Sequence, residues 1–239
     1  MSIFKLLDVN PDDNIATKLF RKKLLLSMLL PLAFIVLIWM IMFLEKQLDI
    51  SFYFLGIYPL ELRGLPGIIT SPFIHSNYEH LFNNTIPLFV LGTAVFYFYS
   101  DIAFSIAGWS WLLTGIFVWL TGREAWHIGA SGLVYALASF LFISGIIRKY
   151  LRLMALSLLV VFLYGSMVWG MFPFVDIHVS WESHMLGAGV GLILAILYRR
   201  KGPQRKLPDW YYEEEYEQEF DDHQTGYIIE NENINNQKS

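Results

Sequence analysis

Residues 24–44 form a run of 21 residues without a single charge, and this run constrains the fold of the chain more than any other feature. A helix needs about 20 apolar residues to cross the hydrocarbon core of a bilayer. The run is longer than the apolar core of a cleavable signal peptide, which has about 7–15 residues, and no small-residue cleavage site follows it. We therefore expect a transmembrane helix that is kept in the mature protein.

Five more apolar segments follow the first, at residues 78–99, 102–120, 128–147, 153–172 and 183–198. The composition agrees with a membrane protein, because only 16% of the residues are charged whereas soluble domains carry about 25%. We expect an all-α membrane protein, a bundle of six transmembrane helices. Its expected parts are a cytoplasmic N-terminal segment (1–23), the six-helix membrane domain (24–200) and an acidic cytoplasmic tail (201–239).

The basic residues predict how the bundle is oriented. Fourteen of the seventeen Lys and Arg residues fall before the first span, between the fourth and fifth spans or after the sixth. The positive-inside rule places such segments in the cytoplasm. We therefore expect both termini in the cytoplasm, and the second, fourth and sixth spans running from outside to inside. The 45–77 segment is then the longest external loop, with its apolar residues in the membrane interface.

Charge is also unevenly divided between the body of the chain and its tail. Residues 207–239 hold ten Asp and Glu against one Lys, a charge of −9, while the rest holds sixteen basic and eleven acidic residues, a charge of +5. We expect the tail to be disordered. Neither part has the basic stripe of a nucleic-acid-binding protein, so we expect no nucleic-acid partner.

Several kinds of metal or covalent chemistry are excluded by composition. The chain contains no Cys, which rules out disulfides, thiolate zinc sites and Cys nucleophiles. The Glu79-His80 pair does not belong to an HExxH zinc motif. We expect neither a metal nor a cofactor.

Polar side chains inside membrane spans are costly, and they mark functional candidates. His80 and Asn84 fall in the first two turns of the second span, Ser131 in the first turn of the fourth and His184 in the first turn of the sixth. Since these spans run in the same direction, the four side chains should lie at a similar depth near the outer leaflet. Together they supply a nucleophile, a general base and oxyanion donors, the groups that acyl transfer needs.

Small residues accompany these polar groups. Gly129 lies two residues before Ser131 in a Gly-Ala-Ser-Gly sequence at the expected start of the fourth span, where free backbone N–H groups can point at an oxyanion. Gly187 and Gly191 follow His184 in the sixth span and allow another helix to approach closely. We expect this close approach to bring the His184 imidazole to the Ser131 hydroxyl.

Taken together, these patterns resemble the rhomboid family of intramembrane serine proteases. The Gly-Ala-Ser-Gly sequence is similar to that family's GxSG motif, the sequence that begins at His184 to its HxxGxxxG motif, and the sequence that begins at His75 to its HxxxxHxxxN segment. The resemblance extends over residues 24–198. One departure concerns the first external loop, where family members often carry a Trp-Arg pair and this chain has Leu62-Arg63.

The resemblance implies an intramembrane serine endopeptidase with Ser131 as nucleophile and His184 as base. Asn84, His80 and the backbone N–H of Ser131 would form the oxyanion hole, and Tyr135 would pack against the His184 ring. The implied substrates are membrane proteins, whose transmembrane segments would be cut near the outer leaflet. The simplest membrane for such a chain is a bacterial inner membrane, since no organellar targeting segment is evident.

Two other functions stay open at this point. A non-catalytic relative would bind or escort membrane proteins, but such relatives characteristically lose the Ser or the His, and both Ser131 and His184 are present. A transporter with a histidine proton relay would show inverted repeats, and the sequence has no such symmetry.

Four further side chains are expected to have ordinary structural roles. We expect His75 to hydrogen-bond the external loop, and His127 to lie in the membrane interface just outside the fourth span. Asp176 and Glu182 are expected to be loop carboxylates that do not complete a triad with His184.

Overall fold

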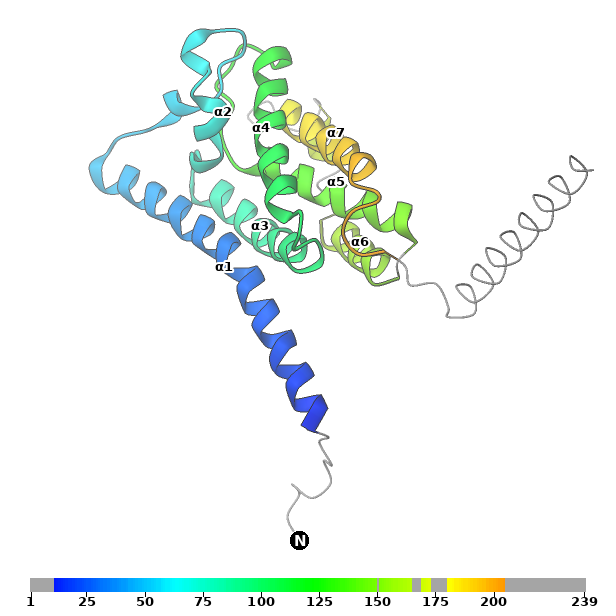
Figure 1. The fold of residues 1–239 in the computed structure, drawn as a ribbon. Helices are drawn as coiled ribbons and strands as arrows, with labels where there is room; N and C mark the ends of the chain where they lie inside the picture. The colour runs from blue at the N-terminus through cyan, green and yellow to red at the C-terminus, as the bar shows by residue number, and fades with distance from the viewer. Residues whose placement is uncertain (1–10, 150, 165–168, 173–179, 205–239) are drawn as a thin grey trace, which may run out of the picture. The chain divides into compact units, whose positions relative to one another are not determined.

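The computed structural model of the chain describes residues 11–149, 151–164, 169–172 and 180–204. Its long helices are α1 (Pro11–Leu48), α3 (Tyr78–Phe98), α4 (Ala103–Thr121), α5 (Ser131–Arg148), α6 (Leu151–Tyr164) and α7 (Trp181–Leu197) (Figure 1). Within the described residues the sole extended pairing is an isolated bridge between Ile57 and His127. The expected all-helical fold is therefore confirmed for this part of the chain.

Four helices, α1, α3, α4 and α5, are long and apolar enough to cross a membrane. They coincide with the first four expected spans. The fifth and sixth expected spans coincide with shorter helices, since α6 has 14 residues and α7 has 17. The membrane-helix bundle is therefore supported, with four full-length candidate spans among the described helices.

Two helices begin at places that differ from the expected spans. Helix α1 begins at Pro11, well before residue 24, because the basic segment that precedes the apolar run is also helical. Helix α5 begins only at Ser131, because Gly129 has a φ of +103°, which an α-helix cannot accommodate. Ser131 is consequently the first residue of its helix, at an end where backbone N–H groups have no helical partner.

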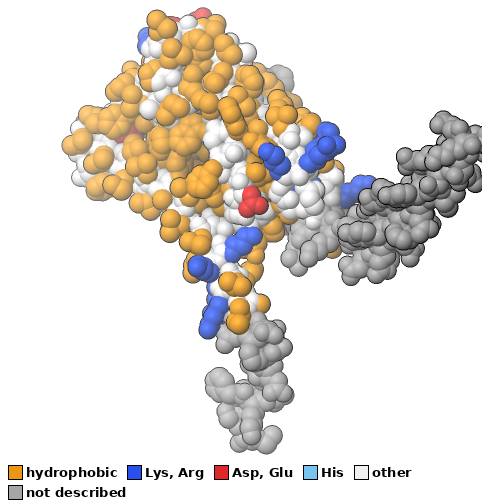
Figure 2. Space-filling view, in the orientation of Figure 1, with side chains coloured by type: hydrophobic (Ala, Val, Ile, Leu, Met, Phe, Trp, Pro, Cys, Tyr) orange, Lys and Arg blue, Asp and Glu red, His pale blue; other side chains and the backbone are white. Residues whose placement is uncertain are grey.

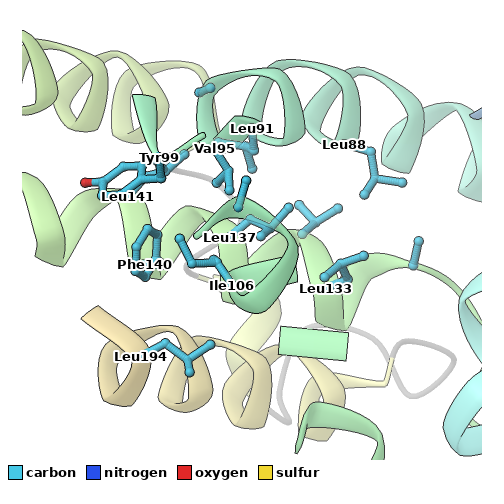
Figure 3. Packing of buried hydrophobic residues seen from close by; sticks show 14 of the residues in the cluster. Leu88, Leu91, Val95, Tyr99, Ile106, Leu133, Leu137, Phe140, Leu141 and Leu194 are labelled. Carbon is cyan, nitrogen blue, oxygen red and sulfur yellow. The ribbon is translucent and has the colours of Figure 1, made fainter. Parts of the chain in front are cut away.

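Helix α5 lies at the centre of the bundle and contacts α3, α4, α6 and α7. In an apolar 18-residue stretch of α5, 61% is buried inside the protein, against 22% in the corresponding stretch of α1. Figure 3 shows side chains of α5 packed against those of its neighbours, among them Leu133, Leu137, Phe140 and Leu141 of α5, Leu88, Leu91 and Val95 of α3, Ile106 of α4 and Leu194 of α7. This packing fixes the position of the helix that begins with Ser131.

The outer surface is apolar. Hydrophobic side chains cover most of the face seen in Figure 2, and α1 alone exposes many large ones, including Leu25, Leu29, Leu32, Val36, Met40 and Phe43. Monomeric soluble proteins rarely expose apolar patches of this extent, which mark contact with a membrane or a partner. The surface is therefore suited to contact with the hydrocarbon core of a lipid bilayer.

The segment between α1 and α3 folds into short helices, namely η2 (Tyr53–Leu55), η3 (Leu62–Gly64), α2 (Gly67–Thr70) and η4 (Ser71–Phe73). Arg63 attaches this segment to the turn before α5, because its guanidinium lies 4.2 Å from the Tyr58 ring and 5.6 Å from the Trp126 ring. Arg63 also forms an ion pair with Glu61 at 2.6 Å. The Leu62-Arg63 departure noted in the sequence thus retains a docking role for the arginine, while Leu62 is exposed.

Candidate active site

Ser131 and His184 are brought together by the packing of α5 against α7. Ser131 is the first residue of α5 and His184 is in the first turn of α7, and the His184 Nε2 lies 2.8 Å from the Ser131 Oγ. The two helices approach so closely that a Cβ at Gly187 would overlap the carbonyl oxygen of Gly132. A Cβ at Gly191 would overlap the carbonyl oxygen of Ala136 in the same way. The glycines predicted to permit this approach therefore lie at the contact.

A backbone carbonyl orients the His184 ring. The Nδ1 of His184 lies 2.9 Å from the carbonyl oxygen of Gly170, and a carbonyl oxygen can only accept a hydrogen bond. The Nδ1 therefore carries the proton, which leaves the Nε2 lone pair to accept from the Ser131 hydroxyl. This is the tautomer in which the histidine can act as a base towards the serine. Sequence reasoning missed Gly170, because a main-chain carbonyl has no sequence signal.

Tyr135 packs on the face of the His184 ring. The two rings are stacked, with centroids 4.1 Å apart and planes 10° apart. Tyr135 lies one helical turn after Ser131 and therefore on the same face of α5. The hydroxyl, the imidazole and the phenol ring thus form one continuous group in which the imidazole plane is fixed.

His80 and Asn84 of α3 lie against the backbone just before Ser131. A Cβ at Gly129 would lie 2.7 Å from the His80 Nε2 and 3.8 Å from the Asn84 Nδ2. Asn84 is buried, and its amide donates one hydrogen bond to the His80 carbonyl at 3.1 Å, which leaves a second N–H on the same nitrogen. Two side-chain donors therefore lie beside the backbone that leads into Ser131, an arrangement able to stabilise an oxyanion formed from a carbonyl group next to the Ser131 Oγ.

Two residues that the sequence did not single out support His80. The Ser76 Oγ lies 3.2 Å from the His80 Nδ1, and the Asn77 side chain caps α3 by accepting from the His80 backbone N–H at 2.8 Å. When the Ser76 hydroxyl donates to Nδ1, the proton of the neutral ring is on Nε2, which faces Gly129. The imidazole is then a donor on the side that faces Gly129, two residues before Ser131.

His75 is a buried histidine beside His80. It is 4% exposed, its ring centroid lies 5.1 Å from that of His80, and neither ring nitrogen makes a hydrogen bond within the described residues. The expected hydrogen bond to the external loop is not formed at strict geometry, although the Phe73 backbone of that loop lies near enough to act on the ring. Burial, and secondarily the nearby His80, lower the pKa of His75 to about 3, and the Phe73 backbone offsets this only in part.

The structure places His127 inside the protein and Glu182 in a helix. His127 is 2% exposed, and burial lowers its pKa; its position at the level of the membrane interface stays a prediction. Glu182 is in the first turn of α7 and 4% exposed, so it is not a loop carboxylate. Both ring nitrogens of His184 are occupied by other partners, and Glu182 does not contact them. Asp176 lies outside the described residues.

A family model described as the Rhomboid domain matches residues 63–201, a range that includes every site residue from His75 to His184. The chain is 33% identical over 191 residues to the uncharacterized protein Rv1337 of Mycobacterium tuberculosis, covering 73% of this chain and 75% of that protein. It is 30% identical over 184 residues to the uncharacterized protein ML1171 of Mycobacterium leprae, covering 73% and 72% of the two chains.

Proposed function

This chain belongs to the rhomboid family of integral membrane proteins, and from that premise we propose that it is an intramembrane serine endopeptidase with a Ser131–His184 dyad. The observation that carries the proposal is the 2.8 Å contact between the His184 Nε2 and the Ser131 Oγ. The Gly170 carbonyl on the opposite nitrogen supports the base form of the imidazole. A merely structural serine would not need a histidine held in that form.

The proposed reaction begins when the Ser131 Oγ attacks the scissile carbonyl and His184 takes its proton. Asn84, His80 and the backbone N–H of Ser131 stabilise the oxyanion of the tetrahedral intermediate. The protonated His184 then gives its proton to the leaving amine, and an acyl-enzyme remains on Ser131. Water activated by the same histidine hydrolyses the acyl-enzyme and restores the serine.

The proposed substrates are transmembrane segments, cut near the outer leaflet. In the proposed topology the chain crosses the membrane six times with both termini in the cytoplasm, so that Ser131 and His184 lie near the outer ends of their helices. An intact substrate helix shields its carbonyl groups from attack. Substrates therefore carry small or helix-destabilising residues near the scissile bond. The bacterial inner membrane is the proposed location, which the mycobacterial relatives support.

We propose that the substrate reaches the dyad laterally from the lipid, past α6 and the 173–181 segment. The described part of α6 packs against α5 and exposes Phe162 and Leu159. A helix held mainly on one side is the one that can move with least loss of packing. This supports α6 as the wall through which a substrate helix passes.

The proposal is tested by labelling membranes with a serine-directed fluorophosphonate. We expect the full-length chain to be labelled, and the Ser131→Ala and His184→Ala variants to remain unlabelled. Ser105→Ala, which removes an exposed serine of α4, is the matched control and should be labelled like the wild type. If the wild type stays unlabelled while another rhomboid protease in the same membranes reacts, the dyad is not functional. A non-catalytic protein that binds membrane clients is then the better description.

A further inference from the structure

His127 is a buried histidine that the proposed reaction does not use, although both of its ring nitrogens have partners. Its Nδ1 lies 2.6 Å from the Ser180 Oγ, and its Nε2 lies 3.0 Å from the Arg123 carbonyl oxygen. Its backbone exchanges two hydrogen bonds with Ile57, at 2.8 and 2.9 Å. Through its ring and its backbone, His127 therefore connects separate segments of the chain.

The partners determine the direction of each hydrogen bond. Because the Arg123 carbonyl can only accept, the His127 Nε2 carries the proton and its Nδ1 accepts from the Ser180 hydroxyl. The Ser180 Oγ then accepts from the Ser183 backbone N–H at 3.3 Å and from the Ser183 hydroxyl at 2.7 Å. An ordered chain of bonds therefore runs from Ser183 through Ser180 to the ring of His127.

This chain of bonds joins the two segments that carry the proposed dyad. Ser180 is the N-cap of α7, and its backbone carbonyl accepts from the His184 N–H at 3.4 Å. On the other side, His127 lies four residues before Ser131 in the turn that leads into α5. Movement of the ring or loss of its acceptor would therefore change how the first turn of α7 sits beside the first residue of α5.

A second contact joins the same two segments. The Arg123 Nε lies 3.5 Å from the Glu182 Oε1, and this carboxylate is buried in the first turn of α7. A negative side chain is favoured at that end of a helix. Arg123 thus contributes its carbonyl to His127 and its guanidinium to Glu182, and both interactions tie the turn after α4 to the start of α7.

We propose that His127 is a positioning residue for the dyad: through Ser180 it sets the first turn of α7 so that the His184 Nε2 faces the Ser131 hydroxyl. This inference rests on the proposed function. His127 itself does not touch the reacting atoms, and its role is to hold two helix ends in register. In this arrangement the N-cap of α7, Ser180, is itself held by a residue from another segment of the chain, His127.

The experiment measures two quantities for the purified full-length chain, the rate constant of fluorophosphonate labelling and its final stoichiometry. His127→Phe keeps a flat ring but removes the acceptor for the Ser180 hydroxyl. We expect labelling to be about tenfold slower, which corresponds to the loss of one hydrogen bond of about 1.4 kcal/mol. The final stoichiometry should be unchanged. His127→Asn retains an acceptor and should recover most of the rate. Ser180→Ala should slow labelling to a similar extent, and the double variant should be no slower than the slower single variant.

Other outcomes are distinguishable. The inference fails if His127→Phe labels at the wild-type rate, if only the stoichiometry falls while the labelled fraction reacts normally, or if the effects of the two single variants multiply. Should His127→Phe not fold, Ser180→Ala decides, because an unchanged rate there excludes the chain of bonds. An unlabelled wild type overturns the proposed function and this inference together, whereas a labelled wild type with unaffected variants overturns the inference alone.

Discussion

Ser131 becomes a useful nucleophile only when a neutral imidazole stands ready to take its proton, and single residues decide whether that condition is met. The Gly170 carbonyl determines which nitrogen of His184 is protonated, and stacking on Tyr135 determines the plane of the ring. Neither interaction involves a carboxylate. In a low-dielectric site this avoids the cost of burying an additional charge.

The proposed oxyanion hole predicts the effect of Asn84→Ala. The variant loses one hydrogen-bond donor to the tetrahedral intermediate, and removing such a donor from a soluble serine protease slows the reaction about 10²–10³-fold. We expect a loss of kcat in this range for cleavage of a transmembrane substrate, with the melting temperature in detergent little changed. Asn83→Ala is the matched control, because Asn83 is exposed one position away on α3, and it should retain its activity. Equal losses in both variants would argue against the assigned role of Asn84.

The buried His75 predicts a loss of stability in acid. Its pKa is lowered from 6.5 to about 3 by burial and by the nearby His80. As the pH falls below 6.5, the unfolded chain takes up the proton first, so this contribution to stability is complete above 6.5 and declines as the pH approaches 3. We expect the melting temperature in detergent to fall between pH 7.5 and 5.0, and to fall less in His75→Phe. An identical fall in both proteins would show that His75 does not contribute.

At the scale of elements, the contact between α5 and α7 decides whether the dyad exists. It depends on α7 residues without side chains, since Gly187 faces the Gly132 carbonyl and Gly191 faces the Ala136 carbonyl. The first turns of both helices are then held by the turn between α4 and α5 and by residues 169–172. The geometry of the site is therefore a property of packed helix ends and not of one loop.

This contact predicts that replacing one glycine of α7 abolishes fluorophosphonate labelling, while replacing another glycine of the same helix leaves it unchanged. Gly187→Val would force α7 away from α5, and we expect fluorophosphonate labelling to be lost although Ser131 and His184 are still present. Gly189→Val is the matched control, because a Cβ at Gly189 has nothing within 4 Å, and it should be labelled normally. Normal labelling of Gly187→Val would mean that the helices need not approach so closely.

The helices and their polar residues could largely be predicted from the sequence, because hydropathy and motif spacing are local signals. Ser131 could be placed near the start of the fourth span for that reason, although α5 begins three residues later than expected. Partners that come from distant loops could not be predicted. The Gly170 carbonyl, the Ser180 hydroxyl and the pairing of His127 with Ile57 depend on tertiary packing, and the burial of Glu182 depends on Arg123, 59 positions earlier. Interior positions of His75 and His127 were missed because a histidine's burial is set by its neighbours in space.

At the scale of the whole molecule, the proposed topology places the external loop and the basic ends of the chain on opposite sides of a bilayer. The described helices supply the apolar surface for this arrangement, and Lys18, Arg21, Lys22 and Lys23 are exposed near the start of α1. The other end of α1 contains Lys46 in its last turn. The short helices that follow it belong to the expected external loop. A chain arranged in this way presents Ser131 towards the outer leaflet.

The absence of Cys from the sequence makes this topology directly testable. Single cysteines are introduced at exposed positions, as Lys46→Cys in the external segment and as Lys22→Cys and Lys201→Cys at the cytoplasmic ends. A membrane-impermeant maleimide added to intact cells should label the first variant and label the other two only after the membrane is opened. Labelling of Lys22→Cys in intact cells would reverse the proposed orientation. Leu91→Cys, in the buried core, serves as the unreactive control.

The contact between Gly170 and His184 has a consequence for genetics. A group on the main chain is present in every variant, so alanine scanning or a saturation library cannot delete it. Any replacement at Gly170 instead places a Cβ 2.6 Å from the Tyr135 hydroxyl, and the library would record steric damage there whatever the carbonyl does. A mutational map of this protein would thus report on the proposed pair Ser131 and His184, while the Gly170 carbonyl stays invisible until the backbone amide itself is altered, for example by an ester bond in a semisynthetic chain.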